Sequence, residues 1–272
     1  MTLPEKYGRY ELHELINSGG MADLYLATDE QKQPVAVRIL KNSGAFDFTD
    51  KKRFVQGCEI LSQIHNHEFV IGYIEHGKQN GSFYLAMEYI EGNNLKLLSA
   101  DSDPVLTENI ATVLIESAQA LEHVHESGFI HLDFKPENIL LSRNASLRLI
   151  DFDLAMAKPD NPIKTKKNPG TPAYMAPEQL LRQPIDHRAD IWAYGVTAFE
   201  LLTGQKPFPG ESAEEIVRLQ LDRSSFQTPR ELNTDIPAMM EKIILKCLEQ
   251  NAEKRYPFAS VLVRDLQTAL YV

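Results

Sequence analysis

The sequence has few cysteines, fewer basic than acidic residues, and no long apolar run. Two cysteines, Cys58 and Cys247, are too few for a disulfide framework and favour a reducing compartment. Lys and Arg total 28 against 38 Asp and Glu, and the formal charge of −10 argues against nucleic acid as the main partner. Residues 191–202, the longest apolar-rich stretch, are too short and too polar to span a bilayer. The first residues do not resemble a signal peptide, so we expect a soluble cytoplasmic protein with no membrane contact.

The remaining composition is that of a folded globular chain. Hydrophobic residues make up 43% of the 272 positions and charged residues 24%, which excludes disorder or a fibrous repeat as a description of the whole chain. The length fits one large domain, or two lobes that share a core.

The pattern of the chain changes near residues 88–92. Before this hinge, short apolar runs alternate with turn residues and predict strands, with one helix at 49–64. The predicted strands are 10–16, 23–27, 34–40 and 83–87. After the hinge the pattern is helical, at 107–125, 190–203, 237–250 and 258–270. We therefore predict an α+β fold: one domain over residues 1–272, with a β-rich N-lobe (about 8–88) and an α-helical C-lobe (about 93–270).

One segment concentrates the residue types that phosphoryl transfer needs. His131-Leu-Asp-Phe-Lys-Pro-Glu-Asn138 is followed, after one apolar run, by Leu-Ile-Asp151-Phe. Asp133 offers a base, Lys135 a cation, and Asn138 and Asp151 two oxygen ligands. Phosphoryl transfer requires a positioned hydroxyl, bound Mg²⁺ and neutralised phosphate charge, and it needs little covalent chemistry from the protein. A His-x-Asp loop alone is more often a structural network, but the combination indicates this reaction.

The segment resembles the catalytic loop and metal-binding motif of the eukaryotic-like (Hanks-type) bacterial Ser/Thr protein kinases. Residues 170–178, Gly-Thr-Pro-Ala-Tyr-Met-Ala-Pro-Glu, resemble the Ala-Pro-Glu segment of that family. Residues 190–195 resemble its Asp-x-Trp-x-x-Gly helix, and Arg255 stands where the family pairs a buried Arg with that segment's glutamate, here Glu178. The resemblance covers about residues 10–266 and implies the bilobal protein-kinase-like fold.

The resemblance also implies the roles of individual residues. Asp133 would accept the proton of the attacking hydroxyl, and Lys135 would contact the γ-phosphate of ATP. Lys135 together with Thr171 indicates Ser/Thr acceptors on a protein substrate. Asn138 and Asp151 would hold Mg²⁺ or Mn²⁺. The implied nucleotide-binding residues are Ile16, Gly19, Leu24, Ala36, Arg38, Met87, Glu88, Ile90 and Leu140.

Two departures from the family concern a single ion pair. Arg38 replaces the lysine of Val-Ala-x-Lys, which serves the α- and β-phosphates, and a planar guanidinium is not equivalent to an ammonium. Gly57 stands where the partner glutamate of that lysine is expected, and Glu59 faces about 200° away around the helix. Both members of the pair are therefore expected to be missing. On that view Arg38→Lys with Gly57→Glu rebuilds the pair and raises kcat/KM more than either change alone.

Further departures lie in three other motifs. The glycine-rich loop keeps Gly19 but has Asn17 and Ala22 in place of the outer glycines. Asp153 replaces the glycine of Asp-Phe-Gly and is interpreted either as an additional metal ligand or as a hydrogen-bonding turn residue. Leu132 replaces the Arg of His-Arg-Asp, which usually contacts a phosphate on the activation loop.

Three functions fit these observations. The first is an atypical Ser/Thr protein kinase with weakened phosphate anchoring, because Asp133, Lys135, Asn138 and Asp151 are retained. The second is a pseudokinase that senses nucleotide or serves as a scaffold for a binding partner, because loss of a phosphate anchor raises the transition-state barrier. The third is a small-molecule kinase, which Asp153 favours and the Ala-Pro-Glu segment disfavours. We favour the first. No pattern in the sequence indicates an oligomeric state.

Overall fold

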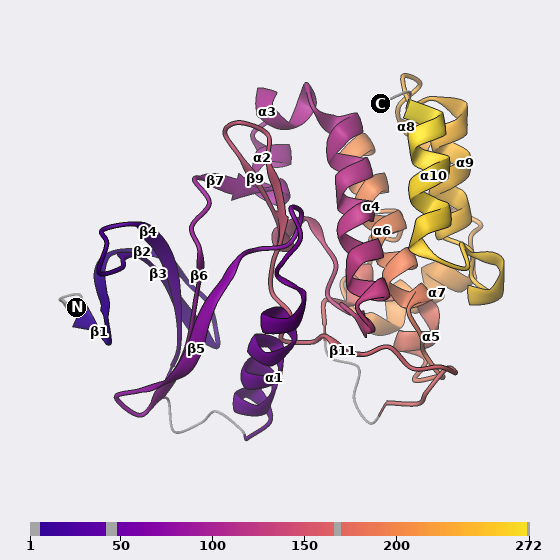
Figure 1. Cartoon of the computed structure of the whole chain (residues 1–272). Helices are drawn as coiled ribbons and strands as arrows, with labels where there is room; N and C mark the ends of the chain where they lie inside the picture. Colours follow the sequence, from indigo (N-terminus) through magenta and orange to yellow (C-terminus); the bar gives the residue numbers. More distant parts are fainter. Residues whose placement is uncertain (1–5, 42–47, 166–169, 271–272) are drawn as a thin grey trace.

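The computed structural model describes residues 6–41, 48–165 and 170–270. Figure 1 shows two lobes: a β-sheet with one helix, and a larger helical lobe at whose far side the chain ends. The predicted α+β, bilobal kinase-like fold is confirmed.

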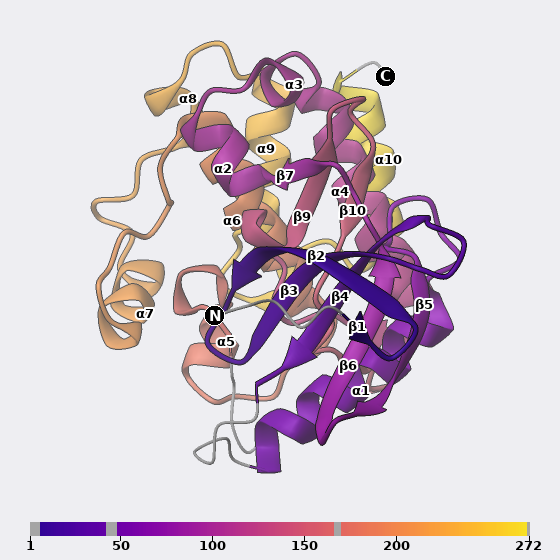
Figure 2. The ribbon, with the colours of Figure 1, turned by 90° about the vertical axis from the view of Figure 1, so that its left-hand side faces the viewer.

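An antiparallel sheet of six strands, in the order β1-β2-β3-β4-β6-β5, forms the N-lobe; Figure 2 looks onto it with the C-lobe helices behind. The strands are β1 (Lys6–Tyr7), β2 (Tyr10–Ser18), β3 (Ala22–Thr28), β4 (Pro34–Leu40), β5 (Tyr73–Gln79) and β6 (Ser82–Glu88). The four predicted strands are all present. Strand β5 was not predicted, because its sequence YIEHGKQ lies at the sheet edge and has no alternating apolar pattern.

The pleat of β4 determines where Arg38 points. Val35 and Val37 pack into a small cluster on the outer face of the sheet, whereas Ala36 and Leu40 belong to the main core. Side chains alternate between the two faces of a strand. Arg38 therefore lies on the inner face, with Ala36 and Leu40.

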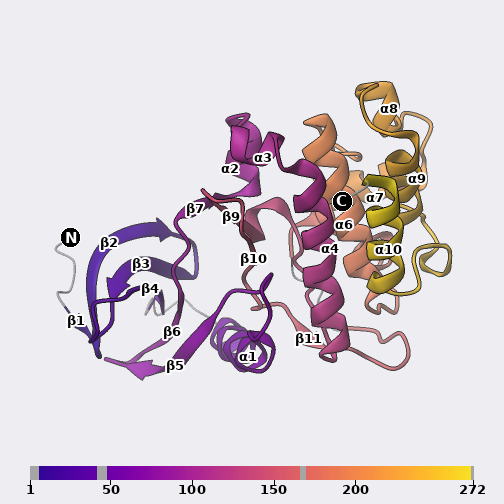
Figure 3. The same cartoon turned by 45° about the horizontal axis from the view of Figure 1, so that its top comes forward.

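Helix α1 (Phe48–Ile64) covers this inner face, and Figure 3 shows it nearly end-on beside β5. Its buried stripe contains Phe54, Cys58 and Leu61, which recur at helical spacing. Gly57 lies on the same stripe. A residue that packs against Gly57 therefore lies close to both α1 and the sheet.

The C-lobe is mainly helical. They are α2 (Leu95–Ala100), α3 (Pro104–Thr107), α4 (Ile110–Glu126), α5 (Pro177–Leu180), α6 (Arg188–Thr203), α7 (Ala213–Leu221), α8 (Pro229–Leu232), α9 (Ala238–Cys247) and α10 (Ala259–Leu270). The predicted helix start at Thr107 is wrong, because Asp103 caps a separate turn that ends there. Within the described part of the chain, no helix combines the length and the apolar character needed to cross a membrane.

Two small sheets position the two segments that contain Asp133 and Asp151 between the lobes. The first has the order β10-β9-β7, with β7 (Gly92–Asn94), β9 (Ile139–Ser142) and β10 (Leu147–Leu149); the second pairs β8 (Phe129–Ile130) with β11 (Met156–Ala157). Residues 131–138 run from β8 to β9, and residues 150–155 run from β10 to β11. The two halves of the motif therefore meet.

Helix α6 is the buried centre of the C-lobe. Trp192 and Tyr194 are almost fully buried, and Gly204, with φ of 71°, ends the helix as predicted. A Cβ atom at Gly195 would lie 2.6 Å from the Cβ atom of Cys247 on α9. The contact between the two helices therefore leaves no room for a side chain at position 195.

We expect Gly195→Ala to lower the free energy of unfolding by about 1–3 kcal/mol, because the added methyl group overpacks the contact with Cys247. Urea unfolding measures this loss. Gly20→Ala is the matched control, since a Cβ atom there meets nothing within 4 Å. Equal stability of the two variants would contradict the close approach.

Candidate active site

A buried carboxylate on α6 fixes the start of the catalytic segment. Asp190 accepts hydrogen bonds from the backbone N–H of His131 and of Leu132, each at 2.8 Å, and from His125 Nε2 at 2.9 Å. Leu132 has a φ of 62°, a left-handed conformation that few L-residues adopt. Burial raises the pKa of Asp190, but the His125 bond and the neighbouring donors outweigh it and hold the pKa below its ordinary value. A charged Asp190 thus stabilises the strained turn. His125 and His131 both have structural roles in this arrangement.

Asp133 lies at the centre of a hydrogen-bond network. Lys135 Nζ lies 2.8 Å from Asp133 Oδ2 and 2.8 Å from Thr171 Oγ1. Asn138 Nδ2 donates to Asp133 Oδ2 at 2.9 Å and to the Asp133 carbonyl at 2.8 Å. In the described part of the chain, no hydrogen bond of this network reaches Asp133 Oδ1. The network therefore fixes the carboxylate and leaves one oxygen for an incoming hydroxyl.

Asp151 is brought beside this network by the backbone. The N–H of Ile150 donates to the Asn138 carbonyl at 2.9 Å, and Asp151 has a left-handed φ of 63°. Burial raises the pKa of Asp151, but the Arg38 guanidinium and nearby donors lower it below its ordinary value. Asp151 is thus ionised at neutral pH, and it offers carboxylate oxygens of the kind that Mg²⁺ prefers.

A cavity of about 500 Å³ lies between the lobes, within the size range of small-molecule sites. The sequence-predicted residues that line it are Gly19, Leu24, Arg38, Met87, Lys135, Asn138, Asp151 and Asp153. Its lining also contains residues that were not predicted as site residues: Glu137 and Ile150, which lie within the quoted motif segments, and Ile71 and Leu85, which lie outside them. Ile150 directly precedes Asp151 and could have been found from that position. Ile71 and Leu85 are ordinary apolar residues with no sequence signal of a site.

Seven predicted residues lie outside the lining of this cavity. Asp133 and Thr171 line a small neighbouring hollow next to it. The other five are Ile16, Ala36, Glu88, Ile90 and Leu140. The Ile16 side chain is 44% exposed, and the Glu88 carboxylate is held by Arg148 at 3.1 Å. Nucleotide contacts of these five residues stay predictions.

The lysine–glutamate pair of the family is absent from this sequence, but Arg38 has a different partner. Its Nη1 lies 3.0 Å from Asp153 Oδ1 and its Nη2 lies 2.7 Å from Asp153 Oδ2, a bidentate pair, while Asp151 Oδ1 is 3.5 Å from Nη1. Burial lowers the pKa of Arg38, but the two carboxylates outweigh it and raise the pKa above its ordinary value. Burial and the charge of Asp151 raise the pKa of Asp153 to about 6, against the lowering effect of Arg38. Asp153 is therefore mostly ionised at pH 7.

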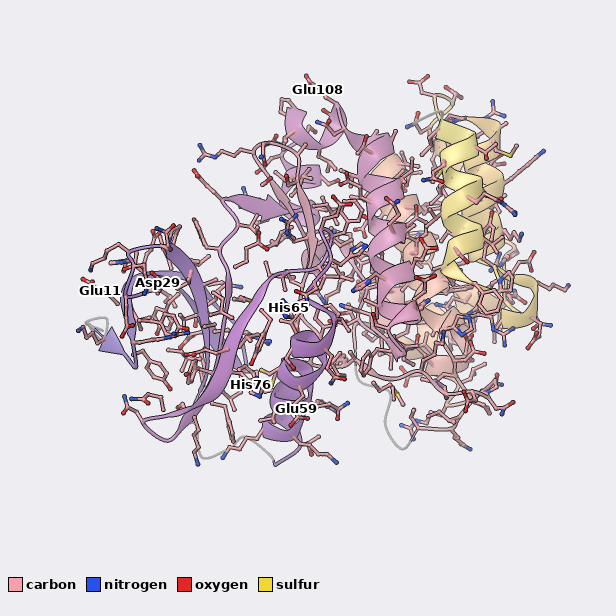
Figure 4. The ribbon with its side chains drawn as sticks, in the orientation of Figure 1. Glu11, Asp29, Glu59, His65, His76 and Glu108 are labelled. Atoms are coloured by element: carbon pink, nitrogen blue, oxygen red, sulfur yellow. The ribbon has the colours of Figure 1, made fainter. Side chains whose placement is uncertain are left out.

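Gly57 is the residue that makes room for Asp153. A Cβ atom at position 57 would lie 2.9 Å from the backbone N of Asp153, from its Oδ1 and from the backbone carbonyl carbon of Phe152. Two of these three atoms belong to the backbone, so the rebuilt pair expected from Arg38→Lys and Gly57→Glu does not fit whichever side chain position 153 carries. Glu59, labelled on α1 in Figure 4, is exposed and takes no part.

Comparison with known proteins identifies the family. A model described as the protein kinase domain matches residues 10–266. The chain belongs to the protein kinase family.

Two similar proteins of this family are bacterial kinases. The chain is 32% identical over 266 residues to serine/threonine-protein kinase PrkC of Bacillus subtilis, covering 96% of this chain and 40% of the relative. It is 31% identical over 275 residues to serine/threonine-protein kinase PknB of Mycolicibacterium smegmatis, covering 98% and 44%. The chain thus spans about two fifths of the length of these relatives. The resemblance to bacterial Hanks-type Ser/Thr kinases is confirmed.

Proposed function

We propose that this kinase domain transfers the γ-phosphoryl group of ATP to Ser or Thr hydroxyls of protein substrates, with Mg²⁺ or Mn²⁺. The observation that carries the proposal is the bridge from Lys135 to both Asp133 and Thr171, beside the cavity that Asn138 and Asp151 line. The names of the relatives, serine/threonine-protein kinases, support a protein hydroxyl as acceptor.

Each side chain then has one task. The acceptor oxygen forms a bond to the γ-phosphorus, the bond to the β-γ bridging oxygen breaks, and the hydroxyl proton passes to Asp133 Oδ1. Lys135 balances the charge on the transferred group. The oxygens of Asn138 and Asp151 fit a hard divalent cation, which would neutralise the phosphates when bound.

The pseudokinase alternative was based on the loss of the family's lysine–glutamate pair as a phosphate anchor. Arg38 instead lies between two carboxylates, Asp151 and Asp153. The family pattern of one lysine, one glutamate and one aspartate has the same net charge. The expected weakening of phosphate anchoring thus loses its main argument, and the alternative has no observation in its favour.

We expect MgATP to raise the melting temperature of the chain. A ligand at 100 times its Kd adds about 2.7 kcal/mol to the free energy of unfolding, which corresponds to several degrees for a domain of this size. Differential scanning fluorimetry with ATP, with and without Mg²⁺ or Mn²⁺, measures the shift. An unchanged melting temperature at millimolar MgATP and MnATP would exclude a nucleotide role.

The acceptor is tested with peptides that differ only in a central Ser, Thr or Tyr. The proposal predicts phosphate on the Ser and Thr peptides, detected by mass spectrometry, and little on the Tyr peptide. Amino-alcohol and aminoglycoside acceptors test the small-molecule alternative in the same assay. Transfer to those compounds but not to the peptides would refute the proposal.

A further inference from the structure

We propose that Asp153 is a positioning residue for Arg38, that Arg38 so positioned binds the inner phosphates of a nucleoside triphosphate, and that Gly57 allows the backbone of Phe152 and Asp153 to lie against α1. The inference deepens the proposed function and rests on it for the nature of the ligand. Residues 38, 57 and 153 then form one interdependent set.

The first observation is how Asp153 uses its two oxygens. Oδ1 and Oδ2 each accept a hydrogen bond from a different terminal nitrogen of Arg38, at 3.0 and 2.7 Å. This parallel fork is the strongest geometry available to a carboxylate and a guanidinium. The Asp153 side chain is only 8% exposed. Both oxygens thus serve Arg38, and we assign Asp153 to that residue rather than to the metal.

The second observation is that Arg38 keeps donors for a ligand. A guanidinium has five N–H groups, and the bidentate pair takes one from each terminal nitrogen. The remaining groups belong to a side chain that lines the 500 Å³ cavity. Among the lining residues given for that cavity, Arg38 and Lys135 are the ones with a permanent positive charge. Lys135 is assigned to the transferred γ-phosphoryl group, so Arg38 is the other lining cation and the one available to the inner phosphates.

The third observation is the fit of α1 against this pair. The Arg38 guanidinium carbon lies 5.3 Å from the centre of the Phe54 ring, and Gln56 Nε2 donates to the Ala155 carbonyl at 2.8 Å. These contacts place Gly57 directly on Asp153, with no space for a Cβ atom. A side chain at position 57 and the present course of the backbone at Phe152 and Asp153 therefore exclude each other. Asp153 supplies Arg38 with the carboxylate that the family resemblance places at position 57.

Nucleotide affinity measured with and without metal tests this assignment. We expect Asp153→Asn and Arg38→Met each to weaken ATP binding about tenfold or more, in EDTA as well as with Mg²⁺, and to raise the KM for ATP. The apparent affinity for Mg²⁺ at saturating ATP stays within about threefold of the wild type in Asp153→Asn, as a positioning residue requires. Glu11→Gln, which alters an exposed ion pair with Lys32, is the matched control.

A double-mutant cycle tests whether Asp153 acts through Arg38, and its double variant removes the unpaired charge that could prevent a single variant from folding. Arg38→Met/Asp153→Asn should bind ATP within about threefold of Arg38→Met alone, because Asp153 affects the nucleotide only through Arg38. A further loss of about tenfold in the double variant would overturn the inference.

The outcomes separate this inference from the proposed function. Phosphotransfer by the wild type with unchanged ATP affinity in Asp153→Asn overturns the inference alone. A loss confined to Mg²⁺ affinity also overturns it, because Asp153 would then be a metal ligand. Weakened ATP binding in Asp153→Asn, with no phosphotransfer by the wild type, overturns the proposed function and upholds the inference.

Discussion

Replacement of Asp133 by Asn is expected to lower kcat for peptide phosphorylation about 10²–10⁴-fold. The amide keeps an oxygen for Lys135 and for Asn138, so the network around it is retained, but it cannot take up the proton of the acceptor hydroxyl. Binding of MgATP should change little, because Asp133 lies beside the cavity rather than in its lining. The effect therefore appears in kcat and not in the KM for ATP.

Steady-state kinetics on the Ser and Thr peptides measure this loss. Asp160→Asn is the control, because it makes the same chemical change at an exposed position. A kcat for Asp133→Asn within threefold of the wild type would show either that another group takes the proton or that a contaminating kinase produces the signal.

The second large effect concerns stability rather than chemistry. Arg255 is fully buried, and its terminal nitrogens lie 2.6 and 2.8 Å from the two carboxylate oxygens of Glu178, with its guanidinium carbon 5.0 Å from the centre of the Trp192 ring system. Removal of one partner leaves a buried charge without compensation. We expect Glu178→Ala to lower the free energy of unfolding by about 3–5 kcal/mol.

Urea denaturation tests this expectation, with Glu11→Ala as the control. That carboxylate pairs with Lys32 at an exposed position, where an ion pair contributes at most about 1 kcal/mol. The double variant Glu178→Ala/Arg255→Met should lose less than the sum of the two single losses, since the unpaired charge is gone. A loss below 1 kcal/mol in Glu178→Ala would contradict a buried, uncompensated arginine.

The sequence was most informative where the signal is local. The run that forms α6 is rich in apolar residues, is buried without interruption from Ala189 to Glu200, and ends at Gly204, so both its burial and its end could be predicted. Strand β5 was missed, because an edge strand with charged residues has no local pattern that separates it from a loop. The start of α4 was misplaced by a few residues, since Thr107 ends one helical turn just before another begins.

The candidate site shows what spacing alone cannot supply. Asp133, Lys135 and Asn138 lie close together in the sequence, so the motif alone predicted that their side chains share one site. Arg38 and Asp153 are 115 positions apart, and their pairing depends on how α1 packs over the sheet. The sequence shows each of these residues as a departure from the family, but only the structure shows that they pair and that Gly57 lies against Asp153.

The most direct test of the central claim is a single-turnover experiment with the chain in excess over ATP and a Thr peptide. With enzyme in excess, a trace contaminant cannot account for rapid consumption of all the nucleotide. We predict one phosphopeptide formed for each ATP consumed, at a rate that Arg38→Met and Asp153→Asn both reduce when ATP is below its Kd. Quantitative ATP binding without any phosphopeptide would contradict the account.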